Sequence, residues 1–428
     1  MRGSGERGCT EVGSLVESSG AHEGTESSPA VPVDLPLTGI VVVDFSQYLA
    51  GPVATLRLVD LGARVIKVER PSSGDAGREL AFAGVRVAGA SLSFHVMNRG
   101  KESFSVDLKD AGQREEVKRL LATVDVLVHN FRPGVMERLG LDYESLRENC
   151  PRLIYASVSG FGNVGPWANK PGQDLVAQSI SGMPWLNGRG GDPPVPVGLA
   201  IADTLASCHL AQGITALLFR RERTGRGGLV ETSLMEAMFD LQLELLPAYL
   251  YDRSKTVKRS SGYGAHAYLG SPYGVFPTAD GYLALAMNPV PWIGEILGIE
   301  ELVAYQEPEN WMEQREVIND LIANRLRTAS TAHWLQLLEA ADAWCAPVNT
   351  LEQVIASEGF AALDMIHEIA QAGPSARNQA VPLQVTRSPL RVDGACLTGT
   401  TGSPRLGEHN VAIRAEVERK RAQSAQEP

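Results

Sequence analysis

The chain has 428 residues, and at roughly 150 residues per domain this length is sufficient for two or three domains with buried cores. Hydrophobic residues make up 44% and charged residues 21% of the sequence, which excludes a wholly disordered or fibrous chain. The sequence carries 39 Lys and Arg against 50 Asp and Glu, a net charge of −11 that repels polyphosphate and argues against a general nucleic-acid binder.

The cellular location can also be predicted. There is no run of about 18 apolar residues, and residues 1–35 contain five glutamates without the apolar core of a signal peptide. The five cysteines are scattered and form no CxxC pair, which is typical of a reducing compartment. We therefore expect a cytoplasmic protein with no membrane partner.

The first half of the chain is typical of an α/β fold. Residues 1–35 are rich in Gly, Ser and Glu and predict a disordered tail. Apolar, β-branched runs predict buried strands at 39–45, 65–68, 126–128 and 153–158, and helical spacing predicts helices at 53–61 and 113–121. This alternation predicts a Rossmann-like, doubly wound parallel sheet.

The second half indicates a change of domain. Helices are expected at 203–223 and 235–251, with a strand at 229–233 between them. A Gly/Ser-rich stretch at 255–274 is the best linker candidate, and it precedes an expected strand at 281–287 and helices at 317–326 and 332–341. We assign a large domain to 36–255, a small α/β domain to 256–345, and a loop-rich return to the large domain with a C-terminal tail to 346–428.

Several familiar motifs are absent or fail in context. Gly160 to Gly165 match G-x-G-x-x-G, but Pro166 and Pro171 follow, so the segment cannot open the helix that a dinucleotide site requires. The eight histidines show neither an HExxH motif nor a ligand spacing with cysteine, and there is no G-x-S-x-G elbow. We expect no metal site and no hydrolase serine.

Two aspartates are candidates for chemistry. Asp203 directly precedes the long predicted helix, which favours an N-cap. The same position also suits a nucleophile that the helix dipole keeps ionised at neutral pH, and the two roles are compatible. Asp174 is either a turn-forming residue or a second active-site carboxylate. Cys208 is expected to be a packed thiol on the same helix.

Basic residues gather near the predicted strand ends. They form either a solvated face or, if they converge, a site for the phosphates of a nucleotide-like ligand. These residues are Lys67, Arg70, Arg99, Lys101, Lys109, Arg132 and Arg138.

Segments spread over about 37–410 resemble family III CoA-transferases, the group that includes formyl-CoA transferase, crotonobetainyl-CoA transferase and α-methylacyl-CoA racemase. Ten segments match in the same order, among them VVVDFSQYLAGPVATLRLVDLGARVIKVERP, VLVHNFRPGVMERLGLDYESL, LIYASVSGFGNVGP, GQDLVAQSISG, PVPVGLAIADT and RLGEHN. Each segment alone is weakly specific, whereas the ordered set is highly specific.

The resemblance implies an acyl-CoA:carboxylate CoA-transferase. It identifies Asp203, in a G-x-A-x-x-D segment, as the nucleophile that forms a mixed anhydride and then an aspartyl-CoA thioester, and it assigns oxyanion donors to the Gly/Ser-rich loop 260–264. Its CoA-contacting positions fall on Leu49, Ala50, Arg70, Val106, Lys109, Asn130, Phe131, Arg132 and Arg138. The resemblance further implies that a CoA thioester is a substrate, that no cofactor is tightly bound, and that the acceptor is a small dicarboxylic acid. It also implies an interlocked homodimer.

Three points in the resemblance separate the branches of the family. Formyl-CoA transferase has Gln where this chain has Leu49, which argues against formyl-CoA as donor. The racemase branch has a proton-transferring His and Glu where this chain has Gln173 and Asn288, and neutral amides cannot act as bases. An α-methylacyl-CoA epimerase and a CoA-binding protein without turnover remain the alternatives to CoA transfer.

Overall fold

The structure is a computed structural model that describes residues 35–254, 258–375, 379–397, 399 and 401–424. The predicted tail, 1–35, lies outside the described residues except for Leu35. Of the helices among the described residues, none is long and apolar enough to cross a bilayer.

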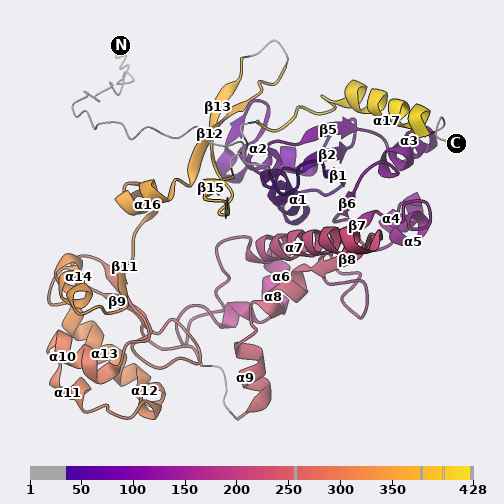
Figure 1. Cartoon of the computed structure of the whole chain (residues 1–428). Coiled ribbons are helices and arrows are strands. Elements are labelled where there is room, and N and C mark those ends of the chain that lie inside the picture. Colours follow the sequence, from indigo (N-terminus) through magenta and orange to yellow (C-terminus); the bar gives the residue numbers. More distant parts are fainter. Residues whose placement is uncertain (1–34, 255–257, 376–378, 398, 400, 425–428) are drawn as a thin grey trace, which may run out of the picture. The chain divides into compact units, whose positions relative to one another are not determined.

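A six-stranded parallel sheet is the main feature of the chain (Figure 1). Its strands, in spatial order, are β5 (Glu102–Ser105), β2 (Arg64–Glu69), β1 (Val41–Asp44), β6 (Val126–His129), β7 (Ile154–Ser159) and β8 (Gly228–Ser233). This is the 3-2-1-4-5-6 order of doubly wound dinucleotide folds. The predicted parallel sheet is confirmed; β5, with its sequence Glu-Ser-Phe-Ser, was not predicted because it lacks an apolar run.

Both faces of the sheet are covered, so nearly every residue of the central strands β1, β6 and β7 is buried. Adjacent residues of β1 serve opposite faces: Val42 belongs to one buried cluster and Val43 to the other. The first cluster is completed by α1 (Ala50–Asp60), α6 (Asp174–Ile180), α7 (Ile201–Thr224) and α8 (Leu234–Asp240). The second is completed by α3 (Ala111–Leu121), α4 (Val135–Leu139), α5 (Tyr143–Leu146) and α17 (Asn410–Ser424).

The predicted helix 235–251 is wrong in one respect, because it is two helices, α8 and α9 (Leu245–Tyr251). At the break, the buried Gln242 side chain donates to the carbonyl of Met238, which a continuous helix pairs with the Gln242 N–H. The Gln242 N–H instead donates to the carbonyl of Phe239, three residues back. The side chain thus competes with the backbone for the same acceptor.

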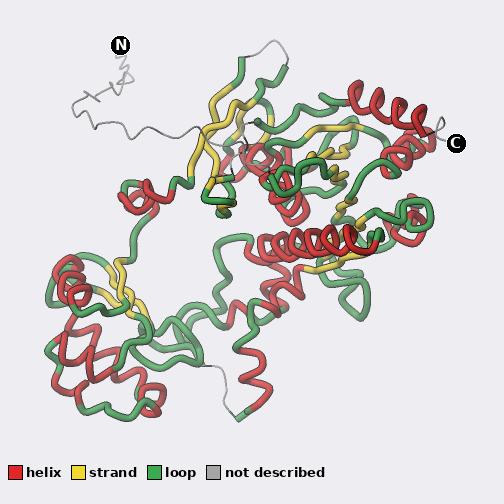
Figure 2. The backbone as a smooth tube through the Cα atoms, viewed as in Figure 1, coloured by secondary structure: helices red, strands yellow, loops and turns green. Residues whose placement is uncertain are grey.

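A separate core lies in residues 276–343. Three antiparallel strands, β9 (Gly274–Pro277), β10 (Tyr282–Leu285) and β11 (Cys345–Pro347), pack with five helices (Figure 2). The helices are α10 (Val290–Leu297), α11 (Glu300–Val303), α12 (Glu309–Glu313), α13 (Arg315–Leu326) and α14 (Thr331–Ala340). The predicted strand and both predicted helices of this region are present.

The segment after 346 is more ordered than the loop-rich prediction. It contains α15 (Leu351–Ile355), α16 (Glu358–Leu363), a hairpin of β12 (Ile366–Gln371) and β13 (Val381–Thr386), and the pair β14 (Arg391–Val392) and β15 (Ala395–Cys396). The hairpin buries Ile369, Leu383 and Val385 against side chains from the short pair β3 (Arg86–Val87) and β4 (Ala90–Ser91) and from α2 (Leu92–Asn98). The signal in the sequence for strand β13 is the alternation of apolar and polar residues along it.

Candidate active site

The order of the strands reverses between β1 and β6, and open α/β sheets bind ligands at the carboxyl ends of their strands at such a point. The two loops that meet there are joined by a pair of hydrogen bonds. The Gln47 N–H donates to Asn130 Oδ1 at 2.9 Å, and Asn130 Nδ2 donates to the carbonyl of Gln47 at 2.7 Å. A single asparagine therefore fixes the spacing of the loops that follow β1 and β6.

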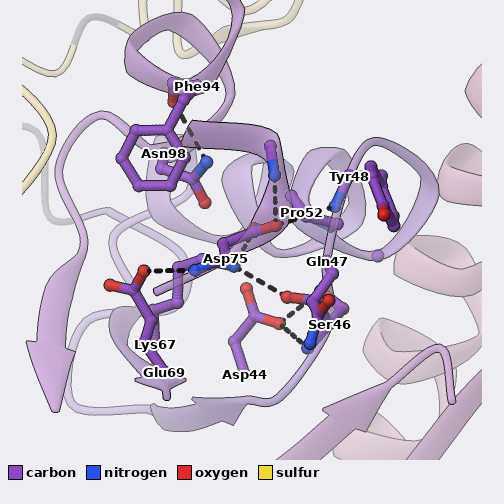
Figure 3. Close-up of polar contacts among 12 residues, drawn as sticks. Asp44, Ser46, Gln47, Tyr48, Pro52, Lys67, Glu69, Asp75, Phe94 and Asn98 are labelled. Carbon is purple, nitrogen blue, oxygen red and sulfur yellow. Dashed lines mark hydrogen bonds and ion pairs between the residues drawn. The ribbon is translucent and has the colours of Figure 1, made fainter. Parts of the chain in front are cut away.

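A buried ionic network holds the loop after β1 (Figure 3). Lys67 Nζ lies 2.8 Å from Asp75 Oδ2 and donates to the carbonyl of Ser46 at 2.7 Å. Asp75 Oδ1 accepts the N–H of Tyr48 at 3.2 Å. Asp44 accepts the N–H of Ser46 at 2.8 Å, and its other carboxylate oxygen lies 3.0 Å from Lys101 Nζ. These contacts fix the loop before any ligand binds.

The ionisation of this network is set by burial and by mutual attraction. Burial raises the pKa of Asp44, but Lys101 and Lys67 outweigh it and hold that pKa well below the usual range. Burial lowers the pKa of Lys101 to about 8 against the opposing attraction of Asp44. The loop also holds Tyr48 at φ 66°, a left-handed conformation that is costly for a non-glycine residue. A charged, fully buried network thus supports a strained turn at the ligand-binding edge.

Asp203 is the third residue of α7, which runs from the carboxyl edge of the sheet back to the start of β8. The expectation that Asp203 is the N-cap is wrong, because the N-cap is Ala200 and makes no side-chain cap. Instead, Asp174 Oδ1 accepts the N–H groups of Ala202 at 2.7 Å and Asp203 at 3.1 Å. With Asp174 capping the helix, the Asp203 carboxylate is not needed for that role.

Asp174 is itself held by a residue that the sequence did not single out. Gln178 Nε2 donates to Asp174 Oδ2 at 2.6 Å and to the carbonyl of Leu199 at 3.2 Å, and Gln178 Oε1 accepts the N–H of Val197 at 2.9 Å. Both Asp174 and Gln178 are buried. Together they fix the segment that leads into α7 and therefore the position of Asp203.

The protonation of Asp203 differs from the expectation. Its side chain is partly buried, and burial together with the charge of Asp174 raises its pKa to about 7. The prediction that this carboxylate is kept ionised at neutral pH is therefore corrected, because burial and the charge of Asp174 both favour its protonated form. Asp203 can consequently gain and lose a proton near neutral pH. Carboxylates with such shifted pKa values concentrate at functional sites.

The positions assigned to CoA by resemblance all follow carboxyl ends of parallel strands. Leu49 and Ala50 begin α1 after β1, Arg70 follows β2, and Val106 and Lys109 follow β5. Asn130, Phe131 and Arg132 follow β6, and Arg138 lies on the short α4 just beyond them. Ala50 and Val106 are buried, whereas Arg70, Lys109, Arg132 and Arg138 are exposed. The topology thus places the set at one edge of the sheet.

Three of the seven basic residues are buried inside the protein and do not form part of a solvated face. Lys67 and Lys101 belong to the network described above, and Arg99 pairs with Asp60 through Nη1 and Nη2 at 2.5 and 3.0 Å. All three side chains are buried and paired with protein carboxylates.

Cys208 is exposed on α7, so the expectation of a packed thiol is wrong.

The racemase positions and the Gly/Ser-rich loop are also accounted for. Asn288 is buried and exchanges hydrogen bonds with the carbonyl and N–H of Trp344, and Gln173 caps α6 through Leu175. Both therefore have structural roles. In the loop 260–264, Ser260 Oγ accepts the N–H groups of Gly262 at 3.3 Å and Gly264 at 3.1 Å. The use of these donors for an oxyanion stays a prediction.

Comparison with known proteins gives consistent matches along the chain. A sequence model described as CoA-transferase family III matches residues 37–410. The chain is 34% identical to an acetyl-CoA:oxalate CoA-transferase of Acetobacter aceti, over 92% of this chain and 98% of that protein. It is 32% identical to a succinate–glutarate CoA-transferase of Agrobacterium fabrum, over 90% and 96%. A solved CAIB/BAIF family protein from Brucella suis superposes with a TM-score of 0.75 at 34% identity, covering 89% of this chain and 99% of that one.

Proposed function

The chain belongs to CoA-transferase family III, and on this premise we propose that it transfers CoA from an acyl-CoA donor to a small dicarboxylic acid through a thioester on Asp203. The relatives named above act on oxalate, succinate and glutarate, which supports a dicarboxylic acceptor. The observation that carries the proposal is the position of Asp203. It lies partly buried in the first turn of α7, with its backbone held by Asp174 and its carboxylate left out of the cap.

The proposed reaction has two mirror-image halves. An Asp203 oxygen attacks the donor thioester carbonyl, the C–S bond breaks, and a mixed anhydride and CoA thiolate form. The thiolate then attacks the aspartyl carbonyl, which forms the aspartyl-CoA thioester and releases the donor acid as its carboxylate. The acceptor carboxylate opens this thioester by the same steps reversed, and Asp203 is regenerated. No water enters and no proton is consumed, so the thioester bond is conserved.

We propose that CoA binds at the carboxyl edge, over the loops after β1 and β6. Support comes from the rigid loop 46–49, the Gln47–Asn130 bridge, and the exposed cations Arg70, Lys109, Arg132 and Arg138 that follow the strands. These cations are suited to the phosphates of CoA.

Trapping tests the nucleophile directly. With acyl-CoA and hydroxylamine, the wild type should yield a hydroxamate on Asp203, and the site is identified by peptide mass spectrometry. Asp203→Asn should lose transfer and trapping, whereas Glu222→Gln, which removes an exposed carboxylate from the same helix, should retain both. Trapping at another residue, or normal transfer by folded Asp203→Asn, contradicts the proposal.

We further propose an interlocked homodimer. Large apolar side chains are exposed on the single chain, including Leu199 at 77%, Phe219 at 69% and Leu351 at 71%, and a partner subunit would cover them. Light scattering should give the mass of two chains. Interlocking predicts that differently tagged dimers do not exchange subunits on mixing until they are unfolded, and free exchange of folded dimers contradicts it.

A further inference from the structure

A cavity of about 460 Å³ lies where segment 186–189 meets segment 259–267. Its lining includes Arg189, Arg259, Arg327 and His266, and of the described residues that line it none is Asp or Glu. The chain as a whole has a net charge of −11. The cavity is therefore a local concentration of positive charge in an acidic protein, which favours an anionic ligand.

The three guanidinium groups differ in how much of their hydrogen-bonding capacity is used. Arg259 donates to the carbonyls of Asn187 and Asp192, so it builds the wall and adds charge. Arg327 donates to the hydroxyl of Tyr263 and to Asn324 Oδ1. The Arg189 guanidinium is exposed and makes no hydrogen bond or ion pair within the described residues. Arg189 thus retains all of its donors, and Arg327 several, for a ligand.

Two carboxylates that contact wall residues are paired with groups other than the guanidinium groups of the cavity. Glu316 Oε2 accepts from Ser260 and Ser261, and Glu316 pairs with Arg315 on its own helix. Asp192 Oδ2 accepts the backbone N–H of Arg189 at 3.2 Å rather than its guanidinium. The guanidinium groups of Arg189 and Arg327 are therefore paired with neither carboxylate and can bind a ligand.

One wall segment of the cavity continues along the chain into the support of Asp203. The Gly190 N–H donates to the carbonyl of Ser260 at 2.6 Å, which joins the two wall segments. Asn187 Nδ2 donates to the carbonyl of Val195 at 3.1 Å, and the chain continues through the residues that Gln178 holds and into α7. One segment thus forms the wall of the cavity and leads to the nucleophile.

We propose that this cavity binds the distal carboxylate of a dicarboxylic acyl group, with Arg189 and Arg327 as the residues that bind it. The inference rests on the proposed function, because it assumes that the other carboxyl group of the same molecule reacts at Asp203. A carboxylate fits because a guanidinium presents paired donors that match its two oxygens. The cavity then selects dicarboxylic over monocarboxylic acids of the same length.

Steady-state kinetics test the selection. Arg189→Gln and Arg327→Gln are compared with the wild type and with Arg226→Gln, an exposed arginine in the turn after α7 and outside the cavity. Acetyl-CoA is the donor, and the acceptors are glutarate and pentanoate, which have the same chain length. Since a hydrogen bond to a charged group is lost, KM for glutarate should rise about 10- to 100-fold, with kcat and the KM for pentanoate changed less than about threefold.

Equal effects on glutarate and pentanoate, or effects no larger than those of Arg226→Gln, overturn the proposal. Calorimetric titration of glutarate without CoA separates this failure from failure of the proposed function. Weaker glutarate binding by Arg189→Gln supports the cavity even if no hydroxamate forms on Asp203. The cavity proposal is wrong if glutarate binding is unchanged in both cavity variants or is undetectable in the wild type. If Asp203 is still trapped normally in that case, the proposed transferase function is unaffected.

Discussion

Asp203 lies in the first turn of α7, and the carboxylate of Asp174, the first residue of α6, caps that same turn, so the two aspartates have different roles. Asp174 accepts hydrogen bonds from two backbone N–H groups and from the side-chain amide of Gln178. Asp203 has burial and the charge of Asp174 acting against its ionisation. The helix cap therefore also sets the protonation of the proposed nucleophile.

This arrangement predicts the pH dependence of transfer. Below its raised pKa of about 7, Asp203 is protonated and cannot attack, so kcat/KM should rise with pH through a midpoint near 7. Asp174→Asn removes the repelling charge and should move the midpoint of kcat/KM to lower pH. It should also lower the thermal stability, because the cap of α7 is altered. Initial rates from pH 5 to 9 at constant ionic strength provide the measurement. An unmoved midpoint in Asp174→Asn contradicts the coupling.

The sequence predicts a role for Asp203 but could not predict its surroundings. A motif at short spacing points to one residue, whereas the Asp174 contact spans 28 positions and the Gln47–Asn130 bridge spans 83. Lys67 and Lys101 were assigned to a surface or a ligand because charge in a sequence usually means exposure. Asp44 at the end of one apolar run and Lys67 inside another were the available signal, since a charge in a buried strand requires a buried partner.

At the scale of elements, two glycines set how closely β7 and α6 approach each other. A Cβ on Gly160 would lie 2.5 Å from the Cα of Gly172, which immediately precedes the turn that carries Asp174. Gly160 is thus needed for close backbone packing. This explains the first glycine of the G-x-G-x-x-G match without a dinucleotide.

Gly160→Ala should therefore displace the segment that carries Asp174. We expect a loss of about 1–3 kcal/mol in unfolding free energy, as for other overpacked sites, together with lower transfer activity. Gly359→Ala is the matched control, because its Cβ meets nothing within 4 Å and its φ is not positive. Urea unfolding and initial rates of both variants provide the measurement. Equal stability of the two variants would show that the contact relaxes at little cost.

The buried network connects β1, β2 and the start of β5 through oppositely charged side chains. Lys101→Met should leave Asp44 with one ammonium partner fewer, at a cost of about 3–5 kcal/mol typical of a broken buried pair. Arg86→Met removes an exposed pair with Glu79 and should cost at most about 1 kcal/mol. Denaturant midpoints measured on both variants give the comparison. A cost below that of Arg86→Met would mean that the network contributes no stability.

Across the whole molecule, the parts that could be predicted are those whose burial is local in sequence. The spacing of Leu210, Ile214 and Leu218 identified α7, and apolar runs identified β1, β6 and β7. The break at Gln242 depends on one side-chain hydrogen bond and could not be predicted from apolar spacing. The C-terminal segment is ordered by contacts with residues about 300 positions earlier, such as those of Asn410 with Ser105.

The C-terminal segment, which includes His409 and α17, covers one edge of the six-stranded sheet. The edge strand of the sheet, β5, has backbone groups that form hydrogen bonds with this segment. The Ser103 N–H donates to His409 Nδ1 at 3.2 Å, and the His409 N–H donates to the carbonyl of Ser103 at 3.1 Å. Ile413 and Val417 of α17 are 1% and 4% exposed within the core of that face. The segment thus protects a strand edge that would otherwise be free to pair with other chains.

Deletion of residues 409–428 should therefore leave an unstable chain that aggregates, whereas deletion of 421–428 keeps both buried side chains and should be tolerated. Ile413→Ala provides a milder test and should cost about 2–5 kcal/mol, as for other large-to-small core changes. Val411→Ala, at a position that is 82% exposed on the same helix, should change the unfolding free energy by less than about 0.5 kcal/mol. Urea unfolding and light scattering provide the measurements. If the 409–428 deletion stays soluble and unfolds at the wild-type midpoint, α17 is dispensable and the edge of β5 needs no cover.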